Sequence, residues 1–148
     1  MNILPKYDED FCGWAEANAL ALQEKRFNDI DCQHLIEELK LMGASEKRAF
    51  ISCLTQLLMH LLKWQFQPSY RVWEISGKSW TLTIKKQRRA IFEILIDNPS
   101  FKPKIAEFIN TAFKNARSDA RIETGLNNFP TECPYTWEQI INDDFYPE

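Results

Sequence analysis

The sequence predicts an all-α protein, a compact helical bundle of about five helices with a C-terminal strap and a short final helix. Two observations carry the all-α prediction: apolar residues recur at helical spacing in five segments, and the alternation typical of strands is nearly absent. With 45% apolar residues and only 4 glycines among 148 residues, the composition is that of a folded protein. Since one hydrophobic core suffices at this length, we expect a single domain over residues 1–148.

The first half of the chain predicts three helices. The first extends from about Asp8 to Arg26, and the second from a cap at Asp31 to Met42. Gly43 then supplies a stop or a bend. The third, about Ser45 to Phe66, is apolar over about half of its circumference and is expected at the centre of the bundle. The second helix has one apolar stripe, which consists of Cys32, Leu35, Ile36, Leu39 and Met42.

A long loop and two further helices are expected next. Residues 65–78 include Pro68 and Gly77 and form the longest predicted loop. Ser79 caps a fourth helix that ends near residue 97, and Ser100 caps a fifth helix with Pro103 in its first turn.

The end of the chain predicts a strap and one short helix. Gly125 is a plausible stop for the fifth helix, and residues 127–134 are expected to be irregular. Thr136 and Gln139 have the spacing of a capping box. Because this acidic tail also carries Phe129, Trp137 and other apolar side chains, we expect it to lie across the bundle rather than to form a free arm.

Charge is segregated along the chain. Residues 1–44 carry 4 Lys and Arg against 9 Asp and Glu, residues 45–122 carry 14 against 6, and residues 123–148 carry none against 6. The basic middle is therefore either neutralised by the acidic ends or presented to a partner. The strongest cationic feature is a basic face close to Trp73, made of Arg71, Lys78, Lys85, Lys86 and Arg89.

The N-terminus, the length of the apolar segments and the cysteine spacing each argue against a class of protein. The N-terminus has no signal-peptide core, and no apolar segment reaches the ~18 residues of a membrane span. The four cysteines show no C-x-x-C spacing, which indicates reduced thiols rather than a zinc or redox motif. We expect a cytoplasmic protein without cofactor or membrane partner, and no nucleophile or phosphate-loop motif is present.

Two histidines and two carboxylates form a candidate polar constellation. His34 and Glu38 lie one turn apart on the flank of the second helix, and His60 and Glu123 lie at the inner borders of the third and fifth. Gathered inside a bundle, they could hold a divalent metal or form interhelical hydrogen bonds. Arg88 lies between apolar positions and predicts a carboxylate partner among Glu37, Glu38 and Glu123.

Several blocks of the chain resemble a known family. These blocks, in order along nearly the whole sequence, are Tyr7-Asp8-Glu9-Asp10-Phe11-x-x-Trp14-Ala15, Leu35-Ile36-Glu37-Glu38-Leu39-x-x-Met42-Gly43, His60-Leu61-Leu62-Lys63-Trp64-Gln65-x-Gln67-Pro68, Ser79-Trp80-x-x-Thr83-Ile84 with Arg88, Ala116-Arg117, Glu123-Thr124-Gly125-Leu126 and Phe129-Pro130-x-x-Cys133-Pro134. Together they are similar to the bacterial family catalogued as domain of unknown function 29.

The resemblance implies a small all-helical cytoplasmic domain and no assigned activity. It places a polar cluster on the family's motif positions, namely Glu37, Glu38, His60, Arg88 and Glu123. His34 matches no motif position. One histidine with carboxylates and an arginine favours a buried ion-pair network over a metal cage, because the arginine would repel the cation.

Three hypotheses of function remain. The first is a non-enzymatic interaction or regulatory module, held by the polar cluster and presenting its basic face to a partner, most simply a protein. The alternative is a metal-dependent hydrolase or other metalloenzyme that uses Glu38, His60 and Glu123. The third is nucleic-acid binding through the region from Arg71 to Arg89.

Overall fold

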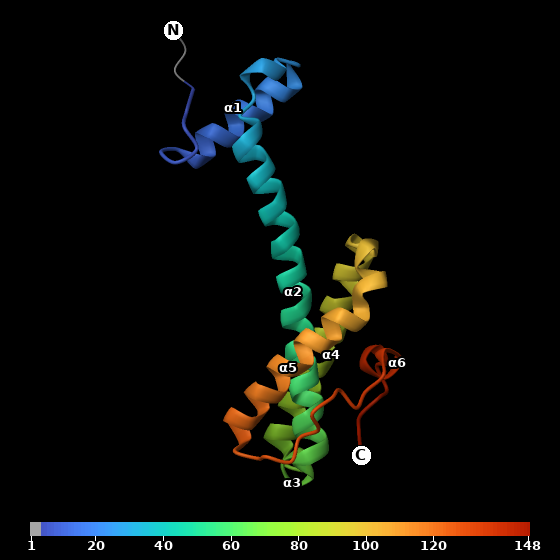
Figure 1. Cartoon of the computed structure of the whole chain (residues 1–148). Coiled ribbons are helices and arrows are strands. Elements are labelled where there is room, and N and C mark those ends of the chain that lie inside the picture. The colour runs from blue at the N-terminus through green and yellow to red at the C-terminus, as the bar shows by residue number, and fades with distance from the viewer. Residues whose placement is uncertain (1–3) are drawn as a thin grey trace. The chain divides into compact units, whose positions relative to one another are not determined.

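Helices account for all the regular structure of residues 4–148, the part of the chain that the computed structural model describes, with the side chains of residues 74–76 left aside (Figure 1). The all-α class is confirmed. In chain order, the elements are α1 (Phe11–Gln23), η1 (Phe27–Asp29), α2 (Cys32–Phe66), α3 (Pro68–Arg71), α4 (Glu74–Asp97), η2 (Pro99–Lys104), α5 (Ile105–Thr124) and α6 (Trp137–Ile141).

The chain divides into two compact units. The N-terminal unit ends at Ser45, and the C-terminal unit comprises residues 46–148. The expectation of one domain over residues 1–148 stays a prediction, and each unit is described by itself below.

Helix α2 corrects the predicted stop at Gly43. A single helix of 35 residues takes the place of the two that the sequence predicts, so the stop is wrong. A glycine inside a helix costs only about 1 kcal/mol relative to alanine, and it ends a helix only where the backbone turns to positive φ. Gly125 makes that turn at φ 72° and ends α5, as predicted, whereas Gly43 does not.

Hydrogen bonds to Asp31 join α1 to the start of α2 in the N-terminal unit. The indole of Trp14 donates to Asp31 Oδ2 at 2.9 Å, and Asn18 Oδ1 accepts from the Asp31 backbone N–H at 2.8 Å. Trp14 and Asn18 are buried. By contrast, much of the apolar stripe of the predicted second helix is exposed, including Ile36, Leu39 and Met42.

The C-terminal unit contains the main hydrophobic core. The second half of α2 lies at its centre, with α4 and α5 packed against it (Figure 1). Its fully buried α2 side chains are Phe50, Leu54, Leu57, Leu58, Leu61 and Leu62. In α5 the three alanines Ala112, Ala116 and Ala120 have no exposed surface. The helical bundle is therefore observed in this unit.

The predicted loop over residues 65–78 is wrong, because the segment contains α3 and the first turn of α4. Pro68 occupies the first turn of α3, where its missing N–H costs nothing. Gly77 lies inside α4, and a Cβ there would overlap the Arg71 carbonyl oxygen. The glycine thus permits a close approach of α3 to α4 instead of marking a loop.

The start of the fifth helix also differs from expectation. Residues 99–104 form a 3₁₀ turn, and the α-helix begins at Ile105 rather than after Ser100. Pro99 and Pro103 lack the N–H groups that α-helical bonding requires, which accounts for the delay.

The C-terminal strap of residues 126–148 lies against the core, as predicted. Arg88 of α4 is 4% exposed and donates to the carbonyl oxygens of Ile140 at 2.9 Å and Phe145 at 2.7 Å. Longer contacts of the same guanidinium reach the carbonyls of Asp143 and Gln139. The capping box of Thr136 and Gln139 is present at the start of α6.

Candidate functional site

Arg88 has different partners from those that the sequence predicts. Its guanidinium donates to four carbonyl oxygens of the strap and not to the carboxylates of Glu37, Glu38 or Glu123. Burial lowers the pKa of Arg88, because the charged form loses hydration. The carbonyl oxygens supply the compensating hydrogen bonds, so Arg88 serves to hold the strap.

Glu123 pairs with a lysine that sequence reasoning assigned no role. Lys63 Nζ lies 2.9 Å from Glu123 Oε1 and 5.3 Å from the ring centroid of Trp80. The residue is only 5% exposed, which is rare for lysine. The ion pair and the indole face compensate for its burial. The one sequence signal for Lys63 is its place next to Trp64 in a block that resembles the family.

His60 is buried beside this pair. Its Nδ1 lies 2.8 Å from the carbonyl oxygen of Gln56, one turn earlier in α2. Burial lowers the pKa of His60, and the nearby Lys63 charge lowers it further. Of the predicted polar cluster, the structure brings His60 and Glu123 close enough to influence each other electrostatically.

Glu38 belongs to a second polar group, in the N-terminal unit. Its Oε1 accepts a hydrogen bond from the hydroxyl of Tyr7. That bond is the main reason that the pKa of Tyr7 is raised to about 12. The Tyr7 ring stacks on the imidazole of His34, with centroids 4.2 Å apart and planes 17° apart. No pairing of Tyr7 with His34 was predicted from the sequence. Glu37 is exposed on the same turn.

His34 completes the group through Asp31. Its Nδ1 lies 2.6 Å from Asp31 Oδ2, the oxygen that also accepts from Trp14. The hydrogen bond raises the pKa of His34 and lowers that of Asp31. Asp31 caps α2 as predicted, and a histidine three residues after a capping aspartate is the signal that could have indicated this pair.

The possible metal ligands are not arranged as a metal site. Within the described part of the chain, no three side chains of His, Cys, Asp or Glu are grouped to hold a metal ion. The alternative hypothesis names Glu38, His60 and Glu123 as metal ligands. These three side chains are not grouped to hold a metal ion.

The predicted basic face divides into a structural residue and exposed cations. Arg71 donates to the Pro147 carbonyl at 3.2 Å and lies over the Trp64 ring, 5.6 Å from its centroid, so it anchors the end of the strap. The remaining cations are exposed along α4, namely Lys78, Lys85, Lys86 and Arg89.

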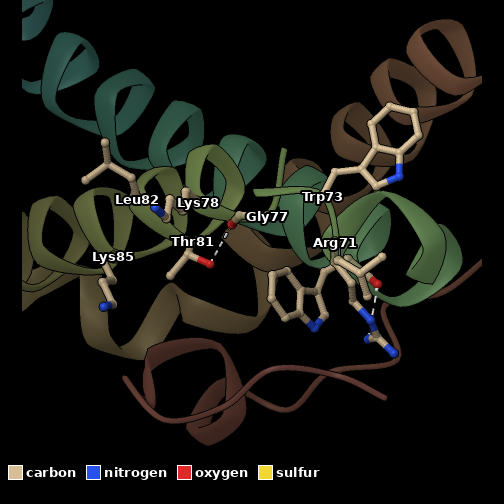
Figure 2. A pocket seen from close by; sticks show the side chains of 9 residues that line it. Arg71, Trp73, Gly77, Lys78, Thr81, Leu82 and Lys85 are labelled. Carbon is tan, nitrogen blue, oxygen red and sulfur yellow. Dashed lines mark hydrogen bonds between the residues drawn. The ribbon is translucent and has the colours of Figure 1, made fainter. Parts of the chain in front are cut away.

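A hollow of about 380 Å³ lies where α3 meets α4, and we call it the cationic hollow. It is lined by Trp64, Arg71, Val72, Trp73, Gly77, Lys78, Thr81, Leu82 and Lys85. Figure 2 shows Lys78, Thr81, Leu82 and Lys85 along α4, with Arg71 and Trp73 from the adjoining segment. Val72 and Trp73 are 78% and 61% exposed, so the same hollow carries large exposed apolar side chains as well as lysines.

Comparison with known proteins identifies the family. No curated protein and no solved structure matches the chain. None of the helices in the described residues has the length and apolar character to cross a membrane. A family model described as "Domain of unknown function DUF29" matches residues 6–146, nearly the whole chain. The chain therefore belongs to the DUF29 family.

Proposed function

We propose that this protein is a non-enzymatic interaction module whose cationic hollow binds an acidic segment of a partner protein. The observation that carries the proposal is the exposure of Trp73 and Val72 beside Lys78 and Lys85 in one hollow. Burying an exposed apolar side chain of this size contributes roughly 1.5–3 kcal/mol, so a partner that covers it gains affinity.

The composition of the hollow favours a protein partner. Tryptophan is a frequent energetic centre of protein interfaces, particularly where it enters a pocket. Val72 and Leu82 also line the hollow, and aliphatic side chains complement a folded or helical segment. Lys78 and Lys85 then select acidic residues around the apolar contact and raise the association rate.

Nucleic-acid binding is the second candidate, and Trp73 is the observation that favours it. An exposed indole among lysines can stack on a base while the lysines contact phosphates. Such binding would weaken steeply with salt, with a slope set by the number of phosphates contacted.

Site-specific photo-crosslinking in the native cell separates the two candidates. Val72→p-benzoylphenylalanine places the crosslinker at the hollow, where 78% exposure leaves the core undisturbed. Ile122→p-benzoylphenylalanine is the matched control, because Ile122 is an exposed apolar residue of α5 that lies outside the hollow.

The expected result is a discrete protein adduct at position 72 that is absent at position 122 and lost when Lys78→Glu and Lys85→Glu are added. A nucleic-acid adduct would favour the second candidate. Equal labelling at both positions, or none at position 72, would refute the proposal.

A further inference from the structure

A second concave surface lies between α4 and α6 in the C-terminal unit, with a volume of about 720 Å³. Its α4 side includes Lys85, Arg89, Phe92 and Leu95, and its α6 side is formed by Trp137 and Ile141. We call it the α4–α6 groove. Phe92 is 64% exposed and Ile141 is 43% exposed, so the apolar floor is open to a ligand.

Charge and apolar surface are ordered along this groove. Residues 85, 89, 92 and 95 follow the spacing of one helical face, so Lys85 and Arg89 precede Phe92 and Leu95 along the same side of α4. From Lys85 to Leu95 the helix rises about 15 Å. One end of the groove is therefore cationic, and the next two turns are apolar.

The cationic end is available for an anion. Lys85 and Arg89 are exposed, and no ion pair involving either is found among the described residues. Arg88 also lines the groove, but its guanidinium is occupied by the strap carbonyls. Asp143 contributes one carboxylate to the lining, which leaves the cations in excess.

The dimensions favour a small molecule over a helical peptide. The second wall is α6, which has 5 residues. At the rise of an α-helix this wall extends about 7 Å, less than the two to three turns of anchors through which a groove recognises a helix. The volume falls within the roughly 300–1,000 Å³ of typical small-molecule sites, which are mostly apolar with a few placed polar groups.

We propose that the α4–α6 groove binds an amphipathic carboxylate, a single alkyl chain with one terminal carboxylate. The carboxylate lies between Lys85 and Arg89, where the guanidinium offers two parallel donors. The chain covers Phe92 and Leu95 on one side and contacts Trp137 and Ile141 on the other. This site is distinct from the function proposed above, although Lys85 borders both surfaces.

Isothermal titration calorimetry of the full chain with sodium decanoate, below its micelle concentration, tests the proposal. We expect saturable binding of one decanoate per chain, and at least tenfold weaker binding of decanol, which has the same chain length without the charge. Arg89→Glu and Phe92→Ser should each weaken decanoate binding at least tenfold. The first removes a cation that holds the carboxylate, and the second removes apolar surface that contacts the alkyl chain.

Matched controls separate this site from others. Lys86→Glu makes the same charge change at an exposed position of α4 outside the groove, and it should leave the affinity within twofold. Trp73→Ala, which alters the cationic hollow, should also have no effect, so failure of one proposal is distinguishable from failure of the other. Circular dichroism of each variant verifies the fold.

Three calorimetric results would each overturn the proposal. They are no saturable decanoate binding, equal affinity for decanol, and equal losses in Arg89→Glu and Lys86→Glu. A sedimentation assay with phosphatidylglycerol vesicles distinguishes a lipid surface from a free carboxylate. Arg89-dependent binding to vesicles without binding of decanoate would also overturn it.

Discussion

Arg88→Ala should release the C-terminal strap and destabilise the C-terminal unit. The guanidinium makes two hydrogen bonds of 2.7 and 2.9 Å to the carbonyl oxygens of Phe145 and Ile140, together with two longer contacts. A hydrogen bond to a charged group contributes roughly 1.5–3 kcal/mol. The two short bonds therefore predict that the free energy of unfolding falls by about 3–5 kcal/mol. This net figure includes an offset, because the substitution also removes the cost of burying the charge.

Urea unfolding followed by circular dichroism measures this loss, and amide hydrogen exchange locates it. Exchange should accelerate first in residues 139–146, because their carbonyl anchor is gone. Arg89→Ala is the matched control, an exposed arginine on the same helix that should change stability by no more than ~0.5 kcal/mol. If Arg88→Ala costs less than about 1 kcal/mol and the strap stays protected, the assignment of Arg88 as its anchor is incorrect.

Two further predictions concern glycines and histidines. Gly77→Ala should destabilise the protein by about 1–3 kcal/mol, because its Cβ would overlap the Arg71 carbonyl, whereas Gly43→Ala, with nothing near it, should stabilise by up to ~1 kcal/mol. Similar effects in denaturant unfolding would contradict the packing at Gly77. The Asp31 hydrogen bond raises the pKa of His34 and burial lowers that of His60, so NMR titration should place them on opposite sides of ~6.5. The His34 contribution to stability is then present below about pH 6.5 and lost as pH rises through its folded pKa, while the His60 contribution falls as pH drops below about 6.5. His34→Gln should remove the first dependence, and the reverse order of pKa values would refute both assignments.

The sequence predicts those parts of the fold that depend on residues close together along the chain. The apolar side chains in the second half of α2 are buried, as their spread over about half of the helix circumference predicts. The turn at Gly125 and the capping box at Thr136 are set by the residues themselves. The predicted breaks at Gly43 and Gly77 are wrong because a glycine within a helix and one in a turn look alike in sequence. Gly77 lies where the Arg71 carbonyl comes close, whereas nothing lies near Gly43.

The candidate site was less predictable, since helical spacing does not specify which helices meet. Arg88 was expected to find a carboxylate, but a folded strap offers carbonyl oxygens that no sequence pattern marks. Lys63 was overlooked because a buried lysine depends on Glu123 and Trp80, which come from two other helices. The sequence marks Trp73 as close to the basic face, whereas Val72 joins the candidate surface only because α3 and α4 meet beside it.

The molecule that crosslinks at position 72 tests the central claim most directly. The account predicts a protein adduct at Val72→p-benzoylphenylalanine that depends on Lys78 and Lys85 and does not form at Ile122. The absence of any adduct at position 72 under conditions where the variant is folded would contradict it.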